Sequence, residues 1–466
     1  MIYPLVLVAL SGLATASPTT QPINFGAILA ATGPSLSGPP VTATGQTGVY
    51  KAAAAASSAS AAVTGVASAS ATHSVAARDL QKRTFCWFGF GWCGSNTGGS
   101  GWGQATTAKP VPTTTSCATS TSNTAVVTTT SSTFVVTSSP VVTSPPAITS
   151  APSTCTPISW TNSNSFTSVS TCSAPYEVGT YCGFINPEDP CAVQPDGNGP
   201  QVQPDTVDAF LAYPEFKADA LNAVTPSGYA QTFQDLNGAV TANTYLGLFT
   251  LKSYDVAGCA AHCDSTDLCT GINIYIERDP SINPEGCSCT NPASITNYKC
   301  TLWGSGVDKS AATNTGQGRS GFDVVITASN GYEKTNNTTP STPSGWNNPQ
   351  NCNRGVHNHP STCMGQQFFP GPFDVNVCAT YAAAQNARNS RSSGIWSFAS
   401  WFGYSPLKCN FFNAFMIKQN GVAKGTYCSL FTQQYPATGP LGANYHPGNA
   451  EGSSWGIESS WSFCSA

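Results

Sequence analysis

A cysteine-containing pattern that occurs twice in the C-terminal half constrains the fold of this chain more than any other feature. Each copy contains, in the same order, Asp-Val-x-x-Cys-Ala, Cys-x-x-apolar-Asn and Cys-x-Leu-aromatic, and the two copies begin at Asp255 and Asp374. Three ordered matches are difficult to obtain by chance and indicate a tandem repeat. We therefore expect two modules, at residues 227–332 and 348–466.

The first copy indicates how one module folds. Asp255 or Ser253 can cap a helix, and Cys259 and Cys263 are four residues apart, so they lie on one face of that helix. Alternating and β-branched segments predict strands at residues 245–251, 271–277, 298–303 and 321–327. The predicted fold class is α+β, with two small disulfide-stapled modules, each a helix packed on an antiparallel sheet.

The first copy resembles the PAN/apple superfamily at Cys259, Cys263, Cys269 and Cys300, the last of which precedes a Leu-aromatic pair. The chain also looks like a group of secreted fungal proteins built of apple-like halves. The resemblance covers the first module well and the second weakly. It implies a helix cradled by a curved antiparallel sheet, binding of proteins or carbohydrates, and the disulfides Cys259–Cys300 and Cys263–Cys269.

The second copy departs from this pattern at one helix position. Cys378 and Cys428 are its disulfide candidates, but Ala382 stands four residues after Cys378, where the first copy has a second helix cysteine. Cys409 therefore lacks its helix partner. It must pair with one of the other cysteines of this module or stay free, and the cysteines available are Cys352, Cys363 and Cys464.

Two loops of the body carry further features. Cys287 and Cys289 lie in a Pro/Gly loop, where they pair locally or with each other, although a bridge across one residue is strained. Asn336 and Asn337 form overlapping glycosylation sequons in the linker 333–347. A glycan at this place fits an exposed hinge between the modules.

The composition indicates the compartment. The chain contains 19 cysteines, which are too many for a reducing cytosol and read as a disulfide framework. Only 9% of the residues are charged and the net charge is −4, which excludes a basic nucleic-acid binder. Residues 1–16 combine an apolar run with a small-x-small cleavage sequence, so we predict a signal peptide and secretion. No apolar tail follows the last cysteine, so no membrane anchor is expected.

Residues 17–83 are predicted to be a disordered pro-segment. They are rich in Ala, Ser, Thr and Gly and hold too few large apolar side chains to offset the entropy of ordering. Lys82-Arg83 resembles the dibasic site of kexin-type proteases, and the composition changes abruptly there. We expect cleavage after Arg83; the alternative is an unprocessed surface pair.

A small aromatic loop, residues 84–104, follows the dibasic site. Cys86 and Cys93 can close it with a disulfide and present a group of aromatic rings that includes Trp87 and Trp92. These rings either pack on another domain or form an exposed adhesive patch. Because flat aromatic rings suit the apolar faces of sugars, both tryptophans are candidate ligand-binding residues.

Two segments separate the aromatic loop from the modules. Residues 105–158 are rich in Ser, Thr and Pro, which is typical of an O-glycosylated, mucin-like linker. Cys117 lies in this linker and is the odd cysteine if the other six before residue 200 pair, so a Cys117-linked dimer is one expectation. Residues 159–226 form a Cys-containing transition region.

The sequence offers one candidate metal cluster. His357 and His359 could hold an ion together with Cys352 or Cys363. Cysteines in an oxidised chain are usually bridged, however, and Pro360 suggests a turn. We therefore predict no metal site, and no cofactor is expected.

No catalytic motif is recognisable, so no catalytic residue is predicted. Low charge and many aromatic rings favour binding, and Trp303, Trp396, Trp401 and Tyr404 are the ligand-binding candidates of the modules. We predict a secreted, non-enzymatic glycoprotein that binds an extracellular polysaccharide or glycoprotein at the cell wall or matrix. Alternatives are a glycan-active hydrolase, which mutation of Asp279 or Glu285 would test, a structural wall protein, and a precursor of a short peptide starting at Thr84.

Overall fold

The computed structural model describes residues 23–39, 45–46, 48–72, 191, 194, 197–287, 289–335, 339–393 and 407–466. Several of the predicted features lie outside these residues. They are the signal peptide, the pair Lys82-Arg83, the loop with Cys86, Trp87, Trp92 and Cys93, the mucin-like linker with Cys117, the sequons at Asn336 and Asn337, and the rings of Trp396, Trp401 and Tyr404.

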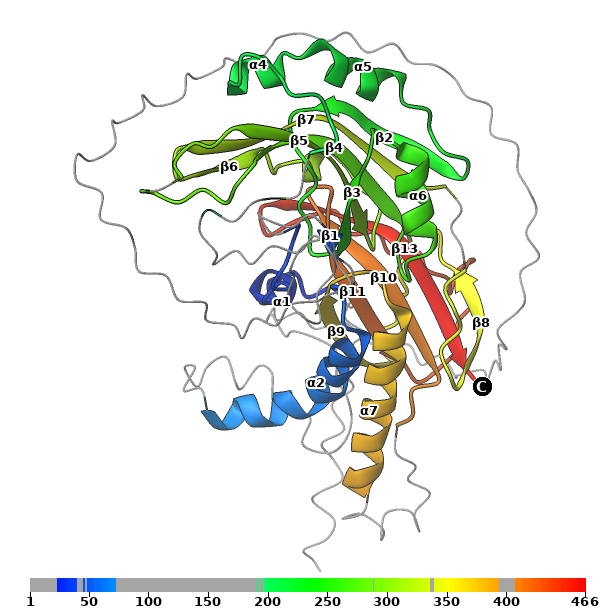
Figure 1. Ribbon diagram of the computed structural model, residues 1–466. Coiled ribbons are helices and arrows are strands. Elements are labelled where there is room, and N and C mark those ends of the chain that lie inside the picture. The colour runs from blue at the N-terminus through cyan, green and yellow to red at the C-terminus, as the bar shows by residue number, and fades with distance from the viewer. Residues whose placement is uncertain are drawn as a thin grey trace, which may run out of the picture.

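The described chain has an α+β fold with two antiparallel sheets (Figure 1). In the first module the sheet order is β3-β5-β4-β7-β2, and β6 pairs with the start of β7. The strands are β2 (Tyr229–Leu236), β3 (Tyr245–Leu251), β4 (Gly271–Pro280), β5 (Ser294–Trp303), β6 (Gly316–Arg319) and β7 (Phe322–Lys334).

The second sheet repeats this topology. Its order is β9-β11-β10-β13-β8, with β12 also paired to β13. The strands are β8 (Trp346–Asn351), β9 (Cys363–Pro370), β10 (Phe411–Gln419), β11 (Val422–Phe431), β12 (Asn449–Ala450) and β13 (Ser453–Ser465). The module's helix follows β3 in the first case, as α6 (Val256–Asp264), and β9 in the second, as α7 (Val375–Ser393). The same arrangement therefore occurs twice, in agreement with the tandem repeat inferred from the cysteine pattern.

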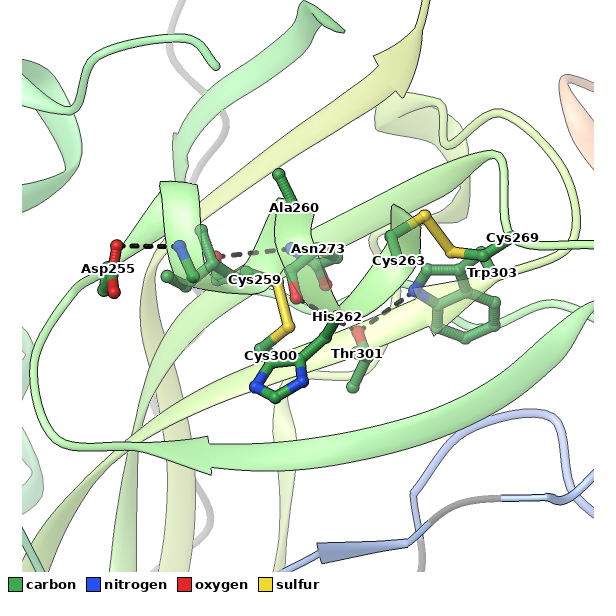
Figure 2. Close-up of a disulfide and its surroundings, with 12 residues drawn as sticks. Asp255, Cys259, Ala260, His262, Cys263, Cys269, Asn273, Cys300, Thr301 and Trp303 are labelled. Carbon is green, nitrogen blue, oxygen red and sulfur yellow. Dashed lines mark hydrogen bonds between the residues drawn. A yellow bond between two sulfur atoms is a disulfide. The ribbon is translucent and has the colours of Figure 1, made fainter. Parts of the chain in front are cut away.

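Two disulfides fix α6 to the first sheet (Figure 2). Asp255 begins the helix, because its carboxylate accepts a hydrogen bond from the backbone N–H three residues further on. Cys259 is bonded to Cys300 on β5, and Cys263 is bonded to Cys269 just before β4. These are the two pairings that the PAN/apple resemblance implies.

In the second module, α7 keeps the first of these bonds and lacks the second. Cys378 is bonded to Cys428 on β11. Ala382, at the position of the second helix cysteine, is completely buried, and Cys409 is a buried free thiol. Cys409 thus stays free, which is one of the alternatives left open by the sequence.

One buried asparagine side chain holds the middle of each sheet. Asn273 on β4 accepts a hydrogen bond from the backbone N–H of Val240 and donates to the backbone of β7. Asn413 on β10 accepts from the backbone N–H of His357 and donates to the backbone of β13. Both side chains are completely buried, so each amide satisfies backbone groups that water cannot reach. The Asn of the repeat pattern is therefore a structural residue.

Part of the expected transition region belongs to the first module. The helices α4 (Val207–Leu211) and α5 (Pro214–Asn222) cover the sheet in Figure 1. Phe210 and Phe216 from these helices are buried in the same core as the cysteines of α6. The apolar side chains of these two helices therefore contribute to the core of the first module.

The cysteine pairing corrects two expectations. Cys289 is bonded to Cys191, 98 residues earlier, so it does not pair within its own loop. Because Cys191 is used in this way, the six cysteines expected to pair before residue 200 do not form a closed set. The reason for choosing Cys117 as the odd cysteine therefore no longer holds.

The described residues of the segment 17–83 contact both modules, which corrects the prediction that these residues are disordered, whereas removal of the segment stays a prediction. We call its described residues, 23–39, 45–46 and 48–72, the strap. Within it, β1 (Gly45–Gln46) pairs with β3 at the edge of the first sheet. The short helix α1 (Phe25–Ala30) packs on the second module's core, and α2 (Ala52–Thr72) runs beside α7 (Figure 1).

The strap is ordered because its few apolar side chains contact surfaces that the modules supply. Ala59 and Val63 of α2 are buried in the core that contains Cys378 of α7. Arg388 of α7 donates a hydrogen bond to the Val63 carbonyl at 2.8 Å. Burial against a folded partner offsets an ordering entropy that the isolated segment cannot offset.

The strap leads to a prediction about stability. Val63→Asp should lower the free energy of unfolding of the full chain by about 3 kcal/mol, because it removes an apolar contact and buries an unpaired carboxylate. Chemical denaturation measures this change. Ser57→Asp places the same charge at an exposed position of α2 and should have little effect. Equal effects of the two substitutions would contradict the packing of α2 on α7.

The missing bridge of α7 leads to a second prediction. Ala382→Cys should form a disulfide with Cys409 and raise the free energy of unfolding by about 3 kcal/mol, because the bond closes a loop in the unfolded chain. Thiol counting on the denatured chain and denaturation with and without reductant measure the two effects. Ala383→Cys, exposed on the same helix, is the control and should add a free thiol. An unbonded thiol in Ala382→Cys would show that the two modules differ at this point.

Candidate functional site

The two modules pack directly on each other at the end of β5. The backbone N–H of Phe373 donates to the carbonyl of Gly304 at 2.9 Å, and that of Gly306 donates to the Glu458 carboxylate at 2.6 Å. A Cβ atom at Gly304 would collide with Pro372, so glycine is needed where the two backbones approach. These contacts fix the spacing of the modules.

A cleft of about 1120 Å³ lies beside this contact. Its walls come from both modules, from the strap and from the segment that links the modules. The charged residues that line it are Asp267, Glu333, Lys334, Arg354, Asp374 and Glu458. Its size is that of a pocket for a substantial ligand, so it is the strongest candidate site among the described residues.

The strap forms part of the cleft wall through Tyr50. The Tyr50 hydroxyl donates to Oδ2 of Asp374 at 2.9 Å, and Oδ1 of Asp374 accepts from the backbone N–H of Asn376 at the start of α7. Burial, together with the Asp374 charge, raises the pKa of Tyr50, so the hydroxyl keeps its proton. One buried carboxylate thus joins the strap, the helix and the cleft.

Two further carboxylates meet at the interface. A Cβ atom at Gly306 would touch the Oε2 atoms of both Glu333 and Glu458, so the two carboxyl groups lie close together. Glu458 also pairs with Lys418 at 3.0 Å. Burial, followed by the charge of Glu458, raises the pKa of Glu333. The cleft therefore contains two neighbouring carboxyl groups in different environments. Glu333 takes up a proton more readily than an exposed glutamate, and Glu458 forms an ion pair with Lys418.

The ring predicted to bind a ligand in the first module is buried, which corrects that prediction. Trp303 has no exposed surface, and its indole N–H donates to the Thr301 hydroxyl at 3.0 Å (Figure 2). A ring in the core cannot stack on a ligand. The half-buried rings of Tyr50 and Phe373 line the cleft instead. The other predicted ring residues, Trp87, Trp92, Trp396, Trp401 and Tyr404, lie outside the described residues.

The acids considered for hydrolysis do not line the cleft. Asp279 is buried in the first module, where it accepts a hydrogen bond from Asn297 at 2.6 Å and pairs with Lys299 at 3.5 Å. Glu285 is also absent from the cleft lining. The carboxylates that line the cleft are different ones: Asp267, Glu333, Asp374 and Glu458.

Sequence reasoning missed Tyr50, Glu333, Phe373 and Glu458. Tyr50 falls in the segment expected to be disordered, and the other three belong to no motif. The sequence did single out Asp374. It is the first residue of the second repeat copy and corresponds to Asp255, the helix cap of the first copy. The remaining lining residues come together only because the two modules and the strap meet.

The histidine pair lies in the second module and does not line the cleft. Nε2 of His357 is 3.7 Å from Sγ of Cys352, which is a buried free thiol. Burial lowers the pKa of His357 to about 3 and that of His359 to about 4, so both rings are neutral at neutral pH. The expectation that Cys352 is bridged is wrong.

The comparisons with known proteins add no relative. No protein-family model matches the chain, and neither a curated protein nor a solved structure matches it. The PAN/apple resemblance therefore depends on the cysteines and strands of the modules. Within the described part of the chain, none of the helices combines the length and the hydrophobicity needed to cross a membrane.

Proposed function

We propose that the chain is a secreted, non-enzymatic binding protein whose ligand site is the cleft between the modules. The observation that carries this proposal is the cleft itself, of about 1120 Å³, at the meeting point of two modules and the strap. Sites at the interface of two folded units are common, because each unit contributes one wall. The ligand that we propose is a chain of sugar residues in an extracellular polysaccharide or glycoprotein.

The lining of the cleft supports a carbohydrate ligand. Tyr50 and Phe373 supply aromatic surface, and Asp267 and Arg354 are exposed polar groups on opposite modules. Sugars combine apolar C–H faces with hydroxyl groups that both donate and accept hydrogen bonds. A lining that mixes rings with carboxylate and guanidinium groups suits both features.

The disulfides support secretion. The bonds Cys191–Cys289, Cys259–Cys300, Cys263–Cys269 and Cys378–Cys428 are among those in the described residues, and such bonds persist in oxidising compartments. The apolar segment in residues 1–16 supplies the signal peptide in this proposal. Cell-wall or matrix location, glycosylation at Asn336 or Asn337 and cleavage after Arg83 belong to the same proposal.

We also propose that both modules are PAN/apple-like. The support is a helix bonded to an antiparallel sheet through Cys259–Cys300, with the equivalent bond Cys378–Cys428 in the second module. The order of the five shared strands is the same in both. Binding of proteins or carbohydrates is the activity that this resemblance implies.

The proposal predicts binding to insoluble polysaccharide. The full chain should be retained by at least one of chitin, cellulose and β-glucan, with soluble glycan as competitor. Phe373→Ala and Asp267→Asn should each weaken retention about tenfold, since the loss of one good contact costs about 1.4 kcal/mol. Leu221→Ala changes an exposed apolar residue that does not line the cleft and is the matched control. Retention that is equal in all variants, or absent for every polysaccharide, would contradict the carbohydrate site.

A second candidate function is glycan hydrolysis, which the pair Glu333 and Glu458 favours. Glycosidases use two carboxyl groups whose environments differ, one as general acid and the other as nucleophile or base. Here burial and the neighbouring charge raise the pKa of Glu333, whereas Glu458 faces Lys418. Glu333 would be the acid in such a reaction.

Hydrolysis is tested separately from binding. If the chain cleaves the polysaccharide that retains it, Glu333→Gln should lower the release of reducing ends by about 10²–10⁴-fold, because the general acid is lost. Retention on the polysaccharide should stay within about twofold, since the amide keeps the shape of the side chain. A wild-type chain that binds without releasing reducing ends excludes this candidate and leaves the binding function.

A further inference from the structure

The second module contains a row of three side chains that the cleft does not use. Cys352 Sγ lies 3.7 Å from Nε2 of His357, and Nδ1 of His357 lies 3.2 Å from Nε2 of His359. Cys352 and His357 are almost completely buried, at 4% and 1% exposure, whereas His359 is half-buried and stacks on Tyr435. The row therefore leads from the protein surface to a thiol in the core.

The hydrogen bonds fix which nitrogen of each ring carries a proton. The His359 ring hydrogen-bonds to the backbone of Leu441, which uses its N–H and leaves Nε2 as the acceptor. His357 then donates from Nδ1 to His359. The lone pair on Nε2 of His357 remains, and it faces the Cys352 sulfur. This is the arrangement in which a histidine binds a metal through one nitrogen while a partner holds the other.

Nothing in the fold requires a histidine at this position. Asn413 holds the backbone N–H of His357, and Asn273 holds that of Val240 in the same way in the first module. The backbone N–H of the buried residue Val240 thus makes the same hydrogen bond as that of His357, so this hydrogen bond does not depend on the side chain. The imidazole of His357 is an addition to the second module, and it is aimed at a free thiol.

Burial raises the pKa of the Cys352 thiol to about 11, so the sulfur keeps its proton until a metal ion replaces it, and neighbouring hydroxyl groups offset part of this effect. The Ser462 hydroxyl lies 3.4 Å from Sγ, and the side-chain N–H of Asn413 lies 4.0 Å from it. The Ser460 hydroxyl also contacts the sulfur. These groups can donate to a deprotonated sulfur from several sides, which is what a metal-bound thiolate requires.

We propose that Cys352 and His357 bind one Cu(I) ion through Sγ and Nε2. Metal bonds of about 2.3 Å to sulfur and about 2.0 Å to imidazole nitrogen span about 4.3 Å in the linear arrangement of two-coordinate Cu(I). Sγ and Nε2, now 3.7 Å apart, therefore move apart by about 0.6 Å when the ion binds. On binding, the S–H bond of Cys352 breaks, the S–Cu bond forms, and the proton leaves to solvent. Copper stays in the Cu(I) state throughout, so no oxidant or reductant takes part.

The charge balance selects a monovalent ion. Cu(I) and one thiolate form a neutral unit, whereas Zn(II) with the same two ligands leaves one positive charge in the core. An unpaired buried charge is strongly unfavourable. Thiolate and imidazole are also ligands that Cu(I) prefers. His359 is a positioning residue in this site, since it holds the proton on Nδ1 of His357.

The second buried free thiol, Cys409, provides a matched control, because no histidine contact is found at its sulfur within the described residues. The full chain with intact disulfides is loaded anaerobically with Cu(I) as its acetonitrile complex and then challenged with bathocuproine disulfonate. The wild type and Cys409→Ser should each retain about one copper per chain, and Cys352→Ser should retain less than about a tenth of that. His359→Phe keeps the ring on Tyr435 but removes the acceptor, and should weaken Cu(I) binding about tenfold.

X-ray absorption at the copper edge of the loaded wild type tests the same site without any substitution. One sulfur and one nitrogen neighbour are expected. A spectrum without a sulfur neighbour, equal copper loss in Cys409→Ser and Cys352→Ser, or a wild type that retains no copper would each overturn the proposal. A chain that retains Zn(II) but releases Cu(I) would overturn the charge argument. Because these results involve no polysaccharide, they stand apart from the test of the cleft.

Discussion

The disulfide between helix and sheet is the constraint on which each module depends. Cys259–Cys300 and Cys378–Cys428 join residues 41 and 50 positions apart, and loops of this length correspond to about 4 kcal/mol of chain entropy. The helix α6 has nine residues, fewer than an isolated helix needs for stability in water. In the first module a second bond holds it. In the second module that bond is absent, and the strap helix α2 packs on α7 instead.

The cleft follows from how closely the modules meet. Gly304 lets the two backbones touch, and Glu458 accepts a hydrogen bond from Gly306 across the interface. Tyr50 then ties the strap to Asp374, at the start of α7. Residues that line the cleft thus hold one another in place through contacts between the strap and the two modules. Because the strap packs on both modules, it also helps to fix the position of one module relative to the other.

The two modules share a framework but differ in what the framework carries. The same asparagine contact positions Val240 in one module and His357 in the other. The first module uses that place for packing, whereas the second turns a ring toward a free thiol. The same topology therefore carries two different chemical environments in the two modules.

The sequence by itself determined the repeat, the α+β class, the cap at Asp255 and the strands of the first module. These are local properties, set by cysteine spacing, alternation and capping within a few residues. Tertiary structure decided the rest. Trp303 was predicted to bind a ligand, but its ring is buried in the core, because the packing of the sheet and not the residue type determines which rings are exposed. The strap looked too poor in apolar residues to fold, and it is ordered because the modules supply the missing surface. The partner of Cys191, the free thiols and the cleft all depend on residues far apart in the chain, which no local pattern can relate.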